Sequence, residues 1–340
     1  MRKLFIAAAL ILCIRYVRGQ SVPATNPQTT IRSTSTLVIV PTMVTSEPGS
    51  LVESLAANDF KLTDNGVEQK VSLEDDVARQ PLSVVVLMQT GCAASRQFAS
   101  YAHLGTMLDY MMGSSAHRIA LVTFDSQPNA IWDFTSSVED LEDGFTHPIP
   151  GDDGAAILDA VNYGIDLLKG QPPTSRRILI LLSQSQDLGS KAHEKEVVRS
   201  LGENNIIIYS VAFSTEKTWL KDQFTKPRHG NSPYKFSPLG PTLIGTFDLG
   251  TPLKVALSAM KENAASEIAS LSGGESVEFG STRDLEQQLG ILANHIPNRY
   301  TLSFRPTSNQ PGFHAIEVRI PAHPELHIAA RTSYWSAGTP

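Results

Sequence analysis

The run of residues 84–88, Val-Val-Val-Leu-Met, limits the possible folds of this chain more than any other feature. No polar residue interrupts it, and small and polar residues follow it at once. A strand with one face in water alternates apolar and polar side chains, so this run predicts a strand buried on both faces. Such strands lie at the centre of parallel sheets, and open α/β folds bind their ligands at the loops beyond the carboxyl ends of these strands.

Strand-like and helix-like segments alternate through the middle of the chain. Further strands are predicted at residues 118–124, 130–134, 177–182, 206–213 and 276–279, the second of them at a sheet edge. Helices are predicted, from apolar residues recurring every three or four positions, at residues 96–112, 136–145, 155–168, 192–202, 254–271 and 283–295. This alternation predicts an α/β domain over residues 79–296, built on a doubly wound, mostly parallel sheet.

Both ends of the chain show a different pattern. Short strands are predicted at residues 36–44, 59–63 and 68–73 near the start, and at 300–305, 313–320 and 326–334 near the end. Three short strands cannot close a core alone. We therefore expect residues 34–78 and 297–340 to form one β-sandwich together, with the α/β domain inserted between them.

The first residues predict export. Arg2 and Lys3 precede an apolar run over residues 4–14, and small residues stand before Gln20, which is typical of a signal peptide at residues 1–20. The run is too short to span a bilayer, although Arg15 and Arg18 leave an uncleaved anchor open. Residues 21–33 predict a flexible leader. We expect a periplasmic, cell-surface or secreted protein without a membrane span in its mature chain.

Charge and motifs exclude several classes of protein. Four of the 28 basic residues and none of the 34 acidic residues lie in residues 1–20, so the rest is clearly acidic, which argues against nucleic acid as a partner. Cys13 lies in the signal, so Cys92 has no intramolecular disulfide partner. No Gly-x-Ser-x-Gly, His-Glu-x-x-His or phosphate-loop motif is present, and nothing in the sequence indicates an enzyme.

Three segments together resemble the marks of a von Willebrand factor type A domain. They are residues 84–88 with the following loop, residues 151–160, and the strand that ends in residues 181–187. The flanks, residues 36–71 and 271–334, resemble those of an exported family of von Willebrand A-related proteins abundant in Acidobacteria. The resemblance covers nearly all of the mature chain. It implies a Rossmann-like fold and a role in protein binding or cell adhesion.

The resemblance also implies a metal site, which this chain does not preserve. The family holds Mg²⁺ with an Asp-x-Ser-x-Ser run, a Thr in a second loop and an Asp after a later strand. The matching positions here hold Gln89, Gly91, Ala93, Ala155 and Gln184. Because Mg²⁺ sheds water reluctantly and no anionic ligand remains to compensate, we expect no metal and no other cofactor. We expect the two Gln amides to hydrogen-bond the loop backbone instead.

Two other features of these loops have more than one interpretation. Asp152, Asp153 and Asp187 could form a displaced metal site if their loops converge, or the first two could cap the helix that follows them. Cys92 could be a reactive thiol, could form an intermolecular disulfide, or could be a small buried residue.

A segment rich in Pro and Gly, residues 215–253, interrupts the α/β pattern. It carries aromatic and basic residues of the kinds enriched at interfaces, namely Trp219, Phe224, Arg228, Tyr234 and Phe236. They predict a partner-binding insertion, unless the aromatics pack onto the domain. We therefore expect an exported, non-enzymatic module that binds another protein or an envelope polymer without a metal. A metal-dependent adhesion module and a structural cell-envelope protein are the alternatives.

Overall fold

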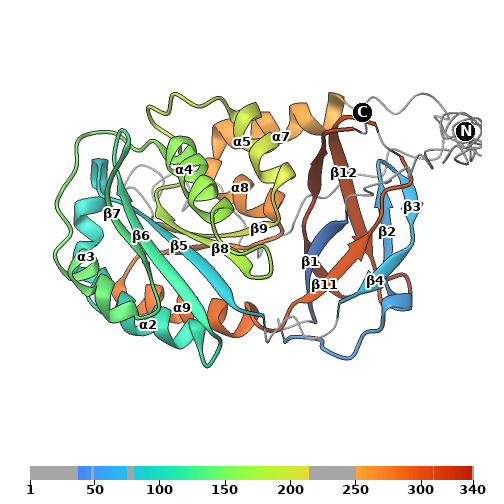
Figure 1. The fold of residues 1–340 in the computed structure, drawn as a ribbon, viewed down its shortest axis with the longest axis horizontal. Helices are drawn as coiled ribbons and strands as arrows, with labels where there is room; N and C mark the ends of the chain where they lie inside the picture. Colours follow the sequence, from blue (N-terminus) through green and yellow to red (C-terminus); the bar gives the residue numbers. More distant parts are fainter. Residues whose placement is uncertain (1–36, 47–49, 75–79, 214–249, 309, 339–340) are drawn as a thin grey trace, which may run out of the picture. The chain divides into compact units, whose positions relative to one another are not determined.

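A six-stranded sheet forms the centre of the α/β domain, in the order β10-β9-β8-β5-β6-β7 (Figure 1). Its strands are β5 (Leu82–Gln89), β6 (His117–Phe124), β7 (Pro128–Thr135), β8 (Arg176–Ser183), β9 (Ile206–Phe213) and β10 (Ser276–Phe279). All neighbours pair in parallel except β7, which runs antiparallel at the edge. Every residue of β5 is buried. The predicted doubly wound, mostly parallel sheet is confirmed.

The computed structural model describes residues 37–46, 50–74, 80–213, 250–308 and 310–338. The predicted signal peptide and leader lie outside these residues. So do Trp219, Phe224, Arg228, Tyr234 and Phe236 of the predicted insertion. Within the described part of the chain, none of the helices combines the length and the apolar character that crossing a membrane requires.

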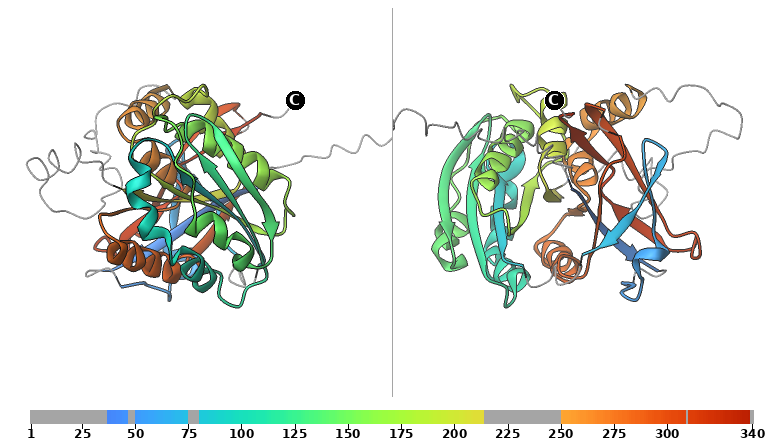
Figure 2. Two further views of the ribbon diagram at one scale, coloured as in Figure 1. Left: turned by 90° about the vertical axis from the view of Figure 1, so that its left-hand side faces the viewer. Right: turned by 45° about the vertical axis from the view of Figure 1, so that its right-hand side comes forward.

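Helices cover both faces of the central sheet (Figures 1 and 2). One face packs against the 3-10 helices η3 (Cys92–Tyr101) and η4 (Val138–Leu141) and the helices α2 (Leu104–Met112), α3 (Glu142–Thr146) and α9 (Thr282–His295). The other face packs against α4 (Ile157–Lys169), α5 (Glu194–Glu203), α7 (Gly250–Glu262) and α8 (Ala264–Ser272). Val84 and Val86 point into the first layer and Val85 into the second, because side chains alternate along a strand.

Three predicted helices are divided in the structure, among them residues 136–145, which form η4 and most of α3. Residues 96–112 form the end of η3 and then α2, and residues 254–271 belong to α7 and α8. Asn263 separates α7 from α8, because its side-chain oxygen accepts a hydrogen bond from the Ser266 amide at 2.9 Å and so begins a new helix. Because the apolar residues keep their helical spacing across this cap, the sequence pattern does not reveal that one helix ends and another begins.

The predicted β-sandwich is also confirmed, as two four-stranded antiparallel sheets. One has the order β13-β1-β11-β4, with strands β13 (His327–Ala330), β1 (Val38–Thr45), β11 (Tyr300–Phe304) and β4 (Val71–Leu73). The other has the order β14-β12-β2-β3, with strands β14 (Ser333–Ser336), β12 (Gly312–Arg319), β2 (Lys61–Asp64) and β3 (Val67–Gln69), and the short helix η1 (Ala57–Asp59) precedes β2. Each sheet combines two strands from each chain end, so neither end forms the core alone.

Two stretches predicted as single strands are each divided between the two sheets. The chain leaves β3 and enters β4 at Lys70, and it passes from β13 to β14 through Arg331 and Thr332. A strand that turns the corner of a sandwich continues in the second sheet. Its polar and apolar residues keep alternating across the corner, which is why the sequence showed one strand in each case.

Arg331 joins the sandwich to the α/β domain within one compact unit, residues 36–340. Its guanidinium is 3% exposed and donates hydrogen bonds to the carbonyls of Leu201 at 3.1 Å and Gly202 at 3.0 Å, in the last turn of α5. Burial lowers the pKa of Arg331 to about 10, so it is charged at neutral pH, as suits the negative end of a helix dipole. Gly273, at φ +82°, lies close to the Arg331 backbone, where a side chain would have no room.

Candidate functional site

Three loops meet at the carboxyl edge of the central sheet. They follow β5, β6 and β8, and the loop that precedes α4 joins them there. The Gly151 amide donates to the Thr90 carbonyl at 2.9 Å, and the Cys92 amide donates to the Asp152 carbonyl at 2.8 Å. The fold therefore brings together the segments in which the sequence resemblance places metal ligands.

Gln89 and Gln184 form a closed pair at this edge. They are 0% and 5% exposed. The Gln184 backbone amide donates to Gln89 Oε1 at 2.9 Å, and Gln89 Nε2 lies 3.4 Å from Gln184 Oε1. Each side-chain amide also donates one hydrogen bond to backbone, Gln89 to the Gly91 carbonyl at 3.1 Å and Gln184 to the Gln186 carbonyl at 2.8 Å. The prediction that these amides hydrogen-bond the loop backbone is confirmed.

Two of the three positions that lack the family's hydroxyl are closed as well. A side chain at Gly91 would place its Cβ 2.1 Å from the Gly154 carbonyl oxygen and 2.8 Å from that of Asp152, and backbone atoms this close leave it no room. Ala155 is fully buried, and its amide and carbonyl both pair with Leu188, at 2.9 and 2.8 Å. The fifth position, Ala93, is half-buried. The loops thus lie directly against one another where the family carries oxygen ligands.

Asp152 is engaged within its own loops. Its carboxylate accepts hydrogen bonds from the Ser126 hydroxyl at 2.5 Å, the Ser126 amide at 3.1 Å and the Gly154 amide at 2.8 Å. These bonds, that of the Ser126 hydroxyl first, lower the pKa of Asp152, so it is ionised well below neutral pH. Its own amide donates to Asp125 at 3.2 Å, a nearly buried carboxylate that the sequence analysis did not identify.

Asp187 has the role that the sequence assigned to Asp152 and Asp153. Its Oδ1 accepts from the Leu158 amide at 3.0 Å, in the first turn of α4, and from the Ser190 hydroxyl at 2.6 Å. The predicted cap was therefore wrong in its residues, because the capping carboxylate comes from the loop after β8. Among the residues that the structure describes, no three His, Cys, Asp or Glu side chains are grouped so that they could hold a metal ion.

Cys92 is half-buried, and its thiol donates a hydrogen bond to the Asp153 carbonyl. Burial and then the charges of Asp153 and Asp152 raise the pKa of the thiol. Since the thiolate is the nucleophile, these surroundings oppose the reactive interpretation of Cys92.

Two exposed aliphatic side chains stand in the same loops. Ile149 is 82% exposed between Pro148 and Pro150, and Leu188 is 48% exposed. The backbone beside each is fixed, by the bond from Gly151 to Thr90 and by the pairing of Leu188 with Ala155. Sequence reasoning missed both residues, because neither periodicity nor a motif marks a single exposed aliphatic side chain in a loop.

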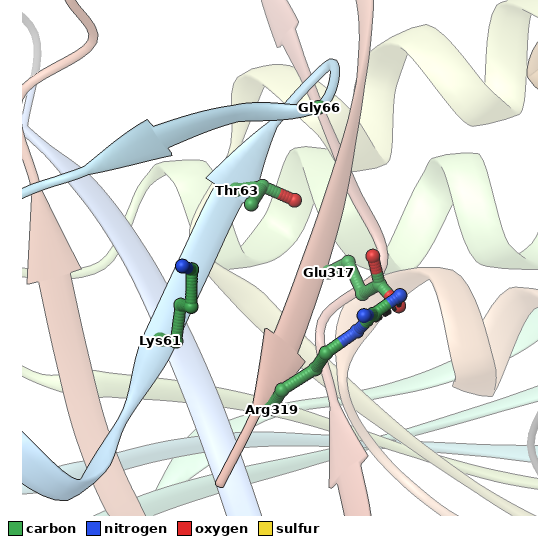
Figure 3. Close-up of a pocket in the computed structure, with 5 residues that line it drawn as sticks. All are labelled: Lys61, Thr63, Gly66, Glu317 and Arg319. Atoms are coloured by element: carbon green, nitrogen blue, oxygen red, sulfur yellow. Dashed lines mark hydrogen bonds and ion pairs between the residues drawn. The ribbon is translucent and has the colours of Figure 1, made fainter. Parts of the chain in front are cut away.

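A separate shallow pocket of about 230 Å³ lies on the outer face of the sandwich, between β2 and β12. Figure 3 shows Lys61 and Thr63 on β2, and Arg319 on β12 with its guanidinium beside the Glu317 carboxylate. Lys61 is likewise paired with Glu68, at 2.8 Å. Both cations are exposed and already have carboxylate partners, so the pocket offers no distinctive chemistry.

No family model matches the chain, and no curated protein matches its sequence. Solved structures with similarity include an aerotolerance-related membrane protein from Bacteroides fragilis, with 12% identity, a TM-score of 0.40, and coverage of 63% of this chain and 98% of that one. BatB from Bacteroides thetaiotaomicron gives 14% identity, a TM-score of 0.39, and 63% and 99% coverage. The von Willebrand factor domain of the type V pilus tip protein Mfa5 from Porphyromonas gingivalis has 19% identity and a TM-score of 0.29, and the match covers 32% of this chain and 39% of that one. These TM-scores are too low to support an inference about function.

Proposed function

We propose that this chain is an exported, non-enzymatic protein-binding module of the von Willebrand A type, which binds its partner at the carboxyl edge of the central sheet without a metal ion. The observation that carries the proposal is the buried, closed hydrogen-bonding pair of Gln89 and Gln184. Export rests on the sequence pattern of residues 1–20.

The chemistry of this pair supports metal independence. Mg²⁺ requires near-octahedral oxygen ligands and usually at least one carboxylate. Here both side-chain oxygens already accept hydrogen bonds, and turning them towards an ion would leave buried amide groups unpaired, at about 1–3 kcal/mol each. A serine hydroxyl cannot be supplied at position 91 without moving the Gly154 backbone. Nothing at these positions compensates the dehydration of the ion.

The binding surface that we propose consists of Ile149 and Leu188, with the ionised Asp152 beside them. Exposed aliphatic side chains on a fixed backbone lose little entropy when a partner covers them, which favours their use in binding. The predicted insertion follows β9, whose carboxyl end belongs to the same sheet edge, and its aromatic residues would extend the surface. The partner class is another protein or an envelope polymer.

Site-specific crosslinking tests this proposal. A photoreactive amino acid at Ile149 should capture a partner from the envelope of the producing cell, whereas the same group at Ile131 on β7, which is 44% exposed, should not. The affinity of the purified partner should then be equal in EDTA and in millimolar Mg²⁺, and Ile149→Ser with Leu188→Ser should weaken it at least tenfold.

Each other outcome favours a named alternative. Binding that EDTA abolishes would favour a metal-dependent adhesion module and overturn the metal-free mechanism. Equal capture from Ile149 and Ile131, with no effect of the two serine substitutions, would favour a structural envelope protein that uses the domain as a spacer.

A further inference from the structure

A histidine and an aspartate form a buried pair inside the sandwich, far from the loops described above. His314 on β12 and Asp64 at the end of β2 are 2% and 3% exposed, and His314 Nδ1 lies 2.8 Å from Asp64 Oδ1. Tyr334 on β14 donates its hydroxyl hydrogen to Asp64 Oδ2 at 2.8 Å. Three adjacent strands of one sheet each supply one member of this group.

The contacts of the two ring nitrogens determine how many protons the pair holds. His314 Nε2 lies 2.8 Å from the Gln310 carbonyl oxygen, which can only accept, so this nitrogen carries a hydrogen. Nδ1 faces a carboxylate oxygen at 2.8 Å, and a hydrogen is needed between these two atoms as well. The pair therefore holds one proton more than a neutral histidine beside an ionised aspartate.

We propose that His314 and Asp64 form a pH-sensitive latch, in which one proton taken up on folding ties the N-terminal strand β2 to the C-terminal strands β12 and β14. In the unfolded chain above about pH 6.5, histidine is neutral and aspartate is ionised, so that proton is absent. Folding at neutral pH thus binds a proton from solvent, and raising the pH opposes folding.

The groups that face His314 are consistent with this latch. Burial lowers the pKa of His314, but the hydrogen bonds to Asp64 and Gln310 and the charge of Asp64 outweigh burial and raise it above its ordinary value. Burial, with the bond to Asp64, raises the pKa of Tyr334, so the hydroxyl stays protonated. Two neutral groups also lie near Nδ1, the Tyr334 hydroxyl at 3.0 Å and the Asn65 side-chain nitrogen at 3.2 Å, and neither adds a charge.

The direction of the pH effect follows from the raised pKa of His314. Its stabilising contribution is fully present below the ordinary pKa of histidine and is lost as pH rises through the folded-state pKa. The burial of all three side chains excludes a substrate from reaching them, so the group resembles a catalytic arrangement in composition only.

Two measurements on the purified protein test the latch. The first is the pH dependence of urea unfolding between pH 6 and 9. Above pH 6.5 the unfolding equilibrium constant of the wild type should rise with pH more steeply than that of His314→Gln. The difference should approach a factor of ten per pH unit until the pH passes the folded-state pKa of His314. Equal slopes in the two proteins would overturn the proposal.

The second measurement is an NMR titration of the wild-type histidines, which remains decisive if His314→Gln does not fold. The His314 ring can be assigned through its proximity to the Tyr334 ring, 4.6 Å away between centroids. We expect its titration midpoint above 6.5, and lower in Asp64→Asn than in the wild type. A wild-type midpoint at or below 6.5 would contradict the latch.

Discussion

Two buried polar pairs join distant parts of this chain, and they differ in kind. Gln89 and Gln184 connect two loops at the edge of the central sheet, while Asp64 and His314 connect two strands of the sandwich. Amides neither titrate nor carry charge, so the first pair is the same at every pH. The second pair needs a proton to form its contacts. Of these two pairs, the one that titrates lies in the scaffold, and the neutral one lies where the resemblance places a charged metal site.

Removing one member of each pair should show the largest difference between the two pairs, in the free energy of unfolding. Asp64→Ala leaves the His314 ring and the Tyr334 hydroxyl without their shared acceptor, and we expect a loss of about 3–5 kcal/mol in the free energy of unfolding at pH 6. Gln89→Ala breaks neutral bonds and should cost about 1–3 kcal/mol. Urea unfolding measures both, and a larger loss for Gln89→Ala would contradict the comparison.

Restoring a hydroxyl at position 91 should be destabilising rather than useful. Gly91→Ser forces a side chain against the carbonyls of Gly154 and Asp152, and we expect a loss of about 1–3 kcal/mol. Gly290→Ser on α9 is the matched control, because no atom lies within 4 Å of a Cβ built there. Equal unfolding midpoints for the two variants would show that the loops have room for an ion ligand.

Divalent ions should leave the thermal midpoint unchanged. An ion that binds only the folded protein, at a hundred times its dissociation constant, adds about 2.7 kcal/mol, or a few degrees for a chain of this size. We expect a shift below about one degree between EDTA and millimolar Mg²⁺, Mn²⁺ or Ca²⁺. A larger rise that Asp152→Ala or Asp187→Ala removes would establish the displaced metal site.

The smallest expected effect is a decrease in the alkylation rate of Cys92 relative to free cysteine. Because burial and the neighbouring aspartates raise the pKa of its thiol, iodoacetamide should modify it at pH 7 more slowly than it modifies a free cysteine. The rate should increase as pH rises towards the raised pKa. Mass spectrometry follows the reaction, and a rate above that of free cysteine would indicate a reactive thiol.

The parts of the fold that were predictable from the sequence are those set by local periodicity. The apolar run in β5 and the alternating terminal strands predicted the sheet and the sandwich, whereas the family resemblance singled out Gln89 and Gln184. Individual side-chain contacts between residues far apart were not predictable. Asp64 and His314 are 250 positions apart, and only the register of β2 with β12 brings them together. The cap that Asp187 provides for α4 was missed for a similar reason, because Asp187 lies 29 positions from Leu158 along the chain.

The pairing of the two chain ends determines the order in which this molecule can fold. β1 has no sheet partner in the described structure other than β11 and β13, which are synthesised some 260 to 290 residues later. The α/β domain, whose strands and helices follow one another along the chain, can form its core first. β2 and β3 can pair with each other early, but among the described strands β1 and β4 have no partner until β11 and β13 have been synthesised, so the sandwich closes only after the α/β domain is complete.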